Sequence, residues 1–142
     1  MDSLVGILII AHGDLGNSLI HCANHVMGKA PEQLACLAVS TSDDPISLLP
    51  QAQAYVKHLN TGAGVLVLSD MYGATPCNLV TKLLQPNMVE GVAGVNLPML
   101  VRVLNYRHEK LASVLEKAIS GGREGVVHFT QLGCQHLESK GQ

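Results

Sequence analysis

His12 and Asp70 are the two residues whose types and positions are best suited to chemistry. His12 follows a continuous apolar run over residues 4–11, and Asp70 follows a second apolar run over residues 65–68. A neutral imidazole is a nucleophile, and a carboxylate bonded to one ring nitrogen fixes the tautomer so that the other nitrogen presents its lone pair. If folding brings the two residues together, they predict nucleophilic histidine chemistry with Asp70 as the orienting group.

Two loops beside this pair have the composition of an anion site. Gly13 allows a sharp turn next to His12, and a second glycine-containing loop leads to Thr75 and Pro76, a pair typical of a helix start. Free N–H groups at a helix N-terminus favour an anion, and Thr75 either caps this helix or hydrogen-bonds a phosphoryl group. Phosphoryl transfer needs mainly positioning and stabilisation of negative charge. The candidate phosphoryl-binding residues are therefore Gly13, Gly73, Ala74 and Thr75.

Short apolar runs alternate with longer amphipathic segments along the chain, which predicts the elements that position these residues. Capping residues, proline at first helical positions and closing glycines mark the helix ends. The predicted strands cover residues 4–10, 34–39, 65–68 and 89–95. The predicted helices start at residue 14 or 17, 45, 75, 97 and 111 and end near 27, 59, 84, 106 and 120, the last stopped by Gly121 and Gly122.

The predicted fold is α/β, an open, twisted and mostly parallel sheet with helices on both faces, in one domain over residues 1–142. Residues 125–129 are predicted as a short antiparallel edge strand, and residues from about 134 to 142 as a polar tail. Ligands of such sheets bind beyond the carboxyl ends of the strands, where successive connections leave for opposite faces. With strand order 2-1-3-4 this point lies between strands one and three, which brings His12 to Asp70.

The composition argues against several classes of function. The 142 residues are 47% hydrophobic and 14% charged, enough for one compact core, and the net charge is only −2. Nine scattered Lys and Arg residues and the absence of Trp argue against a nucleic acid partner or an anionic membrane surface. The first apolar run is too short to cross a bilayer and follows Asp2, so we expect a cytoplasmic protein without a signal peptide.

The remaining cysteines and histidines form no pattern that predicts a site. His21 and His25 have a spacing that can bind a metal, but no third ligand is visible, so neither a metal site nor a cofactor is expected. Without a C-x-x-C pair we expect reduced, mostly buried thiols, and Cys77 as a small buried hydrophobe although a helix N-terminus is near. The cysteines are Cys22, Cys36, Cys77 and Cys134.

Several other polar residues are predicted to be structural or solvated. Arg102 and Arg107 fit solvated helix charges better than contacts with an acidic partner. The remaining histidines have no partner pattern and are expected on the surface or near a terminus. They are His58, His108, His128 and His136.

Four blocks, in this order along nearly the whole chain, carry a resemblance to a known family. They are GILIIAHG at residues 6–13, GVLVLSD at 64–70 with GATPCN at 73–78, GVNLPMLV at 94–101 and GREGV at 122–126. They resemble the mannose-type enzyme IIA domains of the bacterial phosphoenolpyruvate-dependent sugar phosphotransferase system (PTS). Such domains usually carry Trp-Gly-Gly-Ser-Pro-Phe-Asn where residues 72–78 read YGATPCN, so the hydroxyl and proline remain and the aromatic positions change.

The resemblance implies a histidine phosphotransferase in which His12 takes a phosphoryl group from the phosphocarrier HPr and passes it to a IIB component in sugar uptake. The family's orienting aspartate matches Asp70. The resemblance also implies a homodimer in which residues 125–129 cross between subunits, and contact with the membrane only through a permease.

Two other functions compete with this hypothesis. One is a regulatory phosphoacceptor that a partner protein reads without a cognate sugar permease, because no IIB domain follows in this sequence. The other is a phosphohydrolase or mutase that uses His12 as its nucleophile. Histidine phosphatases carry an arginine directly before the histidine to clamp phosphate, and this chain has Ala11 there, which argues against that class.

Overall fold

The structure, a computed structural model, describes residues 3–130 of the 142-residue chain. Strands and helices alternate, as the pattern of apolar runs predicts. The strands are β1 (Gly6–His12), β2 (Leu34–Val39), β3 (Val65–Ser69) and β4 (Val89–Ala93). The helices are α1 (Leu15–Met27), α2 (Pro45–Leu59), α3 (Thr75–Thr81), α4 (Leu97–Tyr106) and α5 (Leu111–Glu124).

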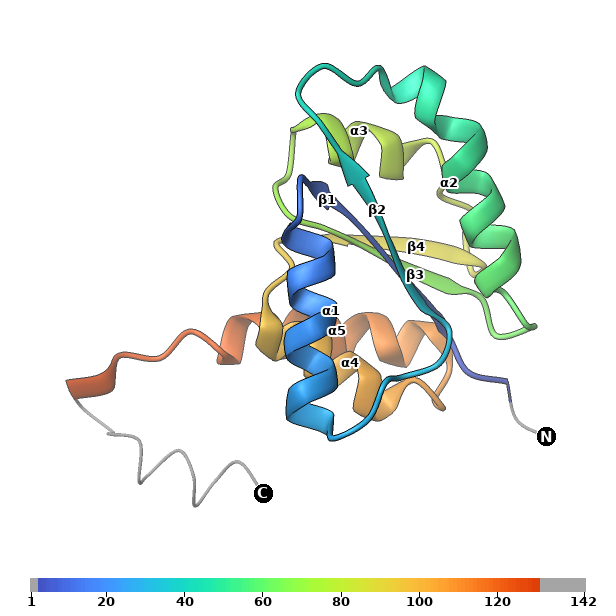
Figure 1. Ribbon diagram of the computed structural model, residues 1–142. Coiled ribbons are helices and arrows are strands. Elements are labelled where there is room, and N and C mark those ends of the chain that lie inside the picture. The colour runs from blue at the N-terminus through green and yellow to red at the C-terminus, as the bar shows by residue number, and fades with distance from the viewer. Residues whose placement is uncertain (1–2, 131–142) are drawn as a thin grey trace.

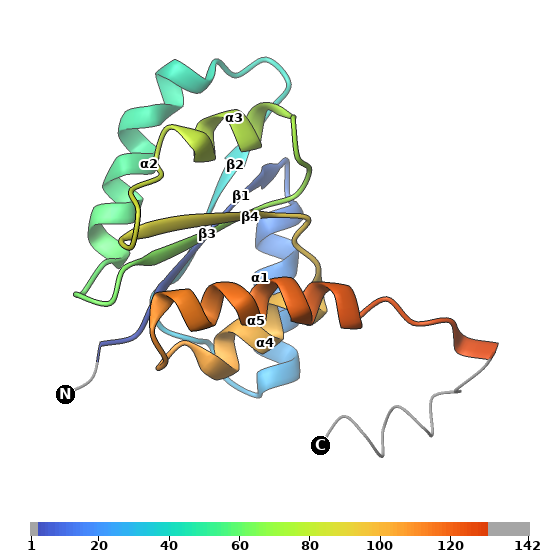
Figure 2. The same cartoon turned by 180° about the vertical axis from the view of Figure 1, so that it is seen from behind.

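The four strands form one parallel sheet in the order β2-β1-β3-β4, which confirms the predicted fold class and strand order (Figure 1). Helices α2 and α3 cover one face, and α1, α4 and α5 cover the other (Figures 1 and 2). Successive residues of β1 point to opposite faces. Ile7 and Ile9 pack in the cluster of the α1, α4 and α5 face, whereas Leu8 and Ile10 pack in the cluster of the α2 and α3 face.

Pairing in the sheet aligns the carboxyl ends of the strands. His12 at the end of β1 lies opposite Val39 at the end of β2, and Ile10 lies opposite Ser69, the last residue of β3. Asp70 directly follows Ser69, so the register carries it to the end of β1. The connection after β1 leads to α1 on one face of the sheet, and the connection after β3 leads to α3 on the other face (Figure 1).

Predicted capping residues set several helix ends. Asp44 accepts a hydrogen bond from the Ile46 N–H at the start of α2, and Asn96 accepts one from the Met99 N–H in the first turn of α4. Gly28 ends α1 in the left-handed conformation with φ 76°. These ends agree with the sequence because a local side chain or a glycine dictates each of them.

The prediction that Gly121 and Gly122 end the last helix is wrong, since α5 continues to Glu124. A Cβ at Gly121 would lie 3.0 Å from the Cβ of Arg102, and one at Gly122 would lie 2.8 Å from the Met99 side chain. The two glycines therefore let α5 approach α4 closely, and they do not act as a stop signal.

The predicted ends of α3 and β4 also need correction. Ala74, not Thr75, is the N-cap of α3, and the helix ends at Thr81 because Lys82 and Leu83 donate to carbonyl groups only three residues back. The strand β4 ends at Ala93, since Gly94 turns the chain with φ 90°.

Residues 125–129 do not form the predicted edge strand. The Gly125 N–H donates to the Gly121 carbonyl oxygen and closes α5, and the following residues leave the sheet rather than align with β4 (Figure 2). A strand needs a neighbouring backbone to satisfy its N–H and C=O groups, and none lies along this segment among residues 3–130. The predicted polar tail at 134–142 lies outside the described residues.

Arg107 is buried, contrary to the prediction of a solvated charge. Its guanidinium donates to the carbonyl oxygens of Val5 at 3.1 Å and Gln33 at 2.8 Å, and also to that of Glu32. Burial lowers the pKa of Arg107, and nearby Glu32 acts in the opposite direction. Arg107 therefore joins the end of α4 to the backbone before β1 and β2. Arg102 is partly exposed, but its guanidinium donates to Glu124 Oε1 at 2.9 Å and to the Ser120 hydroxyl at 3.2 Å, so it is an ion-paired charge and not merely a solvated one.

Candidate active site

His12 and Asp70 are in direct contact at the carboxyl ends of β1 and β3. The His12 Nδ1 lies 2.8 Å from Asp70 Oδ2, and the same oxygen accepts the backbone N–H of His12 at 3.0 Å. The second carboxylate oxygen, Oδ1, accepts the N–H of Met71 at 2.8 Å. One carboxylate thus fixes both the backbone and the ring of His12, and the predicted juxtaposition of the two residues is confirmed.

The electrostatics of the pair keep Asp70 ionised. Burial acts to raise the pKa of Asp70, whose side chain is only 10% exposed, but hydrogen bonds from the His12 backbone, the imidazole and Met71 outweigh burial and lower the pKa below its ordinary value. An ionised carboxylate only accepts, so the His12 Nδ1 carries the hydrogen. The lone pair then belongs to Nε2 of a side chain that is 38% exposed, which is the arrangement of an accessible nucleophile.

The two glycine-containing loops flank this pair with different hydrogen bonding. Gly13 has φ 52° and its N–H donates to the Val39 carbonyl oxygen at 3.0 Å, so Gly13 supplies the turn but no free donor. Gly73 has φ 85°. The N–H groups of Gly73, Ala74 and Thr75 have no acceptor among residues 3–130. The second loop therefore offers unpaired donors ahead of α3.

Other titratable residues do not join the site. Within residues 3–130, no three His, Cys, Asp or Glu side chains come together in a way that would hold a metal ion. His21 and His25 are exposed on α1, and His58, His108 and His128 are also on the surface, as predicted. His136 lies outside the described residues.

The prediction that the thiols are mostly buried is wrong for the cysteines that the structure describes. Cys22 is exposed, and Cys36 and Cys77 are half-buried. The Cys36 thiol donates to Asn17 Oδ1 at 3.1 Å; burial raises its pKa, and Asp14 raises it further. Cys134 lies outside the described residues. The strand β2 has one neighbour in the sheet, which leaves Cys36 less covered than a cysteine in a central strand.

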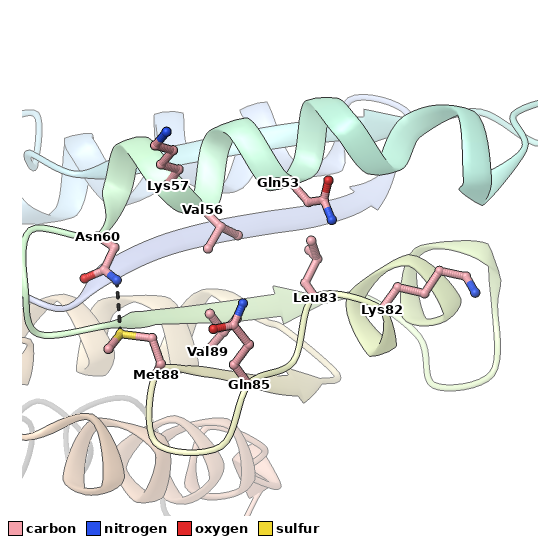
Figure 3. Close-up of a pocket in the computed structure, with 9 residues that line it drawn as sticks. All are labelled: Gln53, Val56, Lys57, Asn60, Lys82, Leu83, Gln85, Met88 and Val89. Carbon is pink, nitrogen blue, oxygen red and sulfur yellow. Dashed lines mark hydrogen bonds between the residues drawn. The ribbon is translucent and has the colours of Figure 1, made fainter.

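A groove between α2 and the connection from α3 to β4 lies apart from this pair (Figure 3). Val56, Leu83 and Val89 form its apolar part, and Asn60 donates to the sulfur of Met88 across one end. Figure 3 shows the side chains of the two lining lysines directed away from the groove. Neither His12 nor Asp70 lines the groove. Its charged lining residues are the two lysines, which point away from it, so no charged side chain is placed to bind a ligand there.

Sequence reasoning missed the apolar side chains around the pair. Met71 and Tyr72 directly follow Asp70 and are 61% and 87% exposed. The available signal was two large apolar residues in a loop after a buried strand, a place where Gly, Asn, Asp and Ser are usual. Met71 also contributes the N–H that holds the carboxylate.

The sequence and this arrangement agree with a known family. A family model described as "PTS system fructose IIA component" matches residues 6–119, a range that contains both His12 and Asp70. The chain belongs to this family. The match confirms the resemblance carried by the four sequence blocks and places the chain among the IIA components of the sugar phosphotransferase system.

Two relatives support the assignment. The mannose-specific EIIAB component of Escherichia coli strain K12 is 30% identical over 125 residues, which cover 86% of this chain and 38% of that protein. The fructose-specific EIIA component of Bacillus subtilis strain 168 is 25% identical over 137 residues, which cover 95% of this chain and 90% of that protein. This IIA chain thus spans 38% of the length of the EIIAB relative.

A solved structure shares the fold. The phosphotransferase system component EIIA of Streptococcus agalactiae superposes with a TM-score of 0.79 at 23% identity, covering 89% of this chain and 98% of that one. In the part of this IIA chain that the structure describes, no helix has both the length and the apolar character needed to cross a bilayer.

Proposed function

We propose that the chain is a cytoplasmic phosphocarrier in which His12 accepts a phosphoryl group from phospho-HPr and passes it to a IIB component. The contact of His12 Nδ1 with Asp70 Oδ2 at 2.8 Å is the observation that carries the proposal. It selects the tautomer that has its lone pair on Nε2. Family membership supports the phosphoryl chemistry, and the partly exposed imidazole is accessible to a protein donor.

The transfer follows from this tautomer. The Nε2 lone pair attacks phosphorus, the new N–P bond forms as the bond to the donor breaks, and the bonding electron pair leaves with the donor nitrogen. The ring of His12 gains positive charge while Nδ1 keeps its hydrogen. The Asp70 carboxylate, 2.8 Å away, stabilises that charge, so Asp70 orients the ring before the step and balances its charge after it.

The loop before α3 is the proposed binding site for the phosphoryl oxygens. The unpaired N–H groups of Gly73, Ala74 and Thr75, with the Thr75 hydroxyl, supply donors for equatorial oxygens. Gly13 contributes by turning the chain away from the ring, because its own N–H already donates to Val39.

We also propose a homodimer, supported by the apolar character of the segment after α5. Val126 and Phe129 are 80% and 64% exposed, and the outer edge of β4 has no neighbouring strand among residues 3–130. An exposed apolar segment and an open sheet edge are both unfavourable in water. A second copy can cover both if the segments of residues 125–129 cross between subunits.

The proposal is tested by measuring the intact mass after incubation with phosphoenolpyruvate, enzyme I and HPr. We expect the wild type to gain one phosphoryl group and to lose it when a IIB component is added. His12→Ala and His12→Gln should gain none, because both variants lack the imidazole that is the proposed nucleophile. His21→Gln is the matched control and should be labelled like the wild type. Full labelling of either His12 variant would refute the proposal.

A further inference from the structure

Ser69, the last residue of β3, is a buried polar side chain in an otherwise apolar strand. It is 2% exposed, and residues 65–68 before it read VLVL. Arg107 is the other buried polar or charged residue among residues 3–130, and it donates to three carbonyl oxygens. The Ser69 hydroxyl makes no hydrogen bond to any group of the same residues. A buried hydroxyl without a partner destabilises a fold, so its presence calls for a functional reason.

The Ser69 side chain lies on the face of the sheet that carries the His12 imidazole. Val65 and Val67 pack in the cluster of the α2 and α3 face, and alternation along β3 places the Ser69 side chain on that face as well. Ile10 of β1 packs in the same cluster and lies opposite Ser69 in the parallel register. His12 is two residues beyond Ile10, so it is the next side chain on this face. Ser69 and His12 are therefore diagonal neighbours on adjacent strands.

Two further observations connect the Ser69 hydroxyl with the reacting end of the imidazole. Asp70 directly follows Ser69 and holds His12 Nδ1 at 2.8 Å, which draws the ring toward the end of β3. Among residues 3–130, the side-chain oxygen that is both fully enclosed and unpaired is Asn24 Oδ1. The Ser69 oxygen is unpaired but is not fully enclosed. It therefore keeps access to the carboxyl end of the sheet, where His12 lies.

We propose that Ser69 is a further catalytic residue, whose hydroxyl donates a hydrogen bond to an oxygen of the phosphoryl group during its transfer to His12 Nε2. The inference rests on the proposed function. Donors aimed at the equatorial oxygens stabilise the negative charge of the transition state. A hydroxyl without a partner in the free protein suits this role, because it gives up no internal hydrogen bond when the phosphoryl group arrives. Ser69 keeps its hydrogen throughout, so the bonds that form and break are those at phosphorus.

The role of Ser69 is tested by the initial rate of phosphoryl incorporation as a function of phospho-HPr concentration. Ser69→Thr and Ser69→Val are a matched pair, because their side chains have the same shape and differ by the hydroxyl. We expect Ser69→Thr to keep the maximal rate within about a factor of three of wild type, and Ser69→Ala and Ser69→Val to lower it about tenfold. KM should stay within about a factor of two, because a buried hydroxyl is not part of the surface on which the donor protein docks.

Thermal unfolding of the same variants separates this role from a structural one. Ser69→Val replaces an unpaired buried hydroxyl by an apolar side chain suited to a strand, so it should unfold at a temperature about 3 °C above that of Ser69→Thr. The more stable variant of the pair is then the slower one. A purely structural hydroxyl would instead lower stability and rate together when it is removed. Ser18→Ala, at an exposed serine on α1, is the control and should match wild type in both measurements.

A wild-type maximal rate in Ser69→Ala, or equal rates in Ser69→Thr and Ser69→Val, would overturn the proposal for Ser69 and leave the proposed function standing. A lower unfolding temperature for Ser69→Val than for Ser69→Thr would also overturn it, because the hydroxyl would then have a structural partner. Absence of label on the wild type itself would instead remove the proposed function, and with it the role of Ser69.

Discussion

The site around His12 and the segment after α5 differ in how far one chain completes them. At the site, Asp70 accepts the His12 N–H, contacts the His12 ring and accepts the Met71 N–H. In the C-terminal segment, Val126 and Phe129 expose most of their apolar surface, and no strand pairs with the backbone there among residues 3–130. The fold of a single chain supplies these contacts at the site around His12, whereas it leaves the apolar side chains of the C-terminal segment exposed.

This difference has a physical origin. The site lies at the ends of two central strands, so the register of a buried parallel sheet places its residues and leaves few alternatives. The C-terminal segment follows a helix end and has no such template. A segment of this kind gains order only when something external supplies backbone partners and covers its side chains. Catalytic geometry and assembly are therefore expected to respond to different substitutions.

Among the variants, Asp70→Asn is expected to have the largest effect. It should slow transfer at the site around His12 and leave the C-terminal segment unaffected. The amide does not balance the positive charge on the phosphorylated ring and does not enforce the same tautomer, so transfer from phospho-HPr should slow about 100-fold. Sedimentation of the variant should show the wild-type oligomeric state, because the Asp70 carboxylate bonds to His12 and Met71 and to none of residues 125–129. A rate equal to wild type would mean that Asp70 does not orient His12.

The converse variant is Val126→Asp combined with Phe129→Asp. Two charges in a proposed apolar interface should raise the dimer dissociation constant about 30-fold or more, as measured by sedimentation or by light scattering over a dilution series. Labelling of His12 should remain at the wild-type rate. Val26→Asp, at another exposed valine, is the control and should not alter assembly. Loss of labelling in the double variant would show that the site depends on the dimer.

The smallest effect concerns pH. The folded-state pKa of Asp70 lies below its unfolded value, so its ionised form stabilises the fold fully at pH values above the unfolded pKa. That stabilisation disappears as pH falls through the lowered folded pKa. The unfolding free energy of wild type should exceed that of Asp70→Asn by about 1–2 kcal/mol near neutral pH, and the gap should close in acid. Chemical denaturation at a series of pH values measures it; a gap independent of pH would contradict the assignment.

Sequence patterns predicted those features that local chemistry or topology controls. The second strand, over residues 34–39, and the second helix, over residues 45–59, agree with their predicted bounds, because apolar runs and the Asp44 cap mark them. The contact of His12 with Asp70 followed from the predicted strand order together with the predicted strand ends. For these features, local sequence or the topology of the sheet supplies the signal.

The features that escaped prediction depend on partners distant in the sequence. Arg107 resembles any charged residue at a helix end until three carbonyl groups from other segments surround it. Gly121 and Gly122 resemble a helix stop until α4 packs against them. The roles of the phosphoryl-binding residues stay predictions, as does the crossing of residues 125–129 between subunits.

The alternation of side chains along β1 determines which face of the sheet carries the His12 side chain. His12 falls in step with Leu8 and Ile10, whose side chains pack toward the α2 and α3 face. A slip of one residue in strand pairing would turn every side chain over and carry the imidazole to the opposite surface of the sheet. Such a slip would also separate the imidazole from Asp70, which follows β3. If His12 is the phosphoryl acceptor that we propose, labelling is therefore expected only of chains in which β1 and β3 pair in the native register.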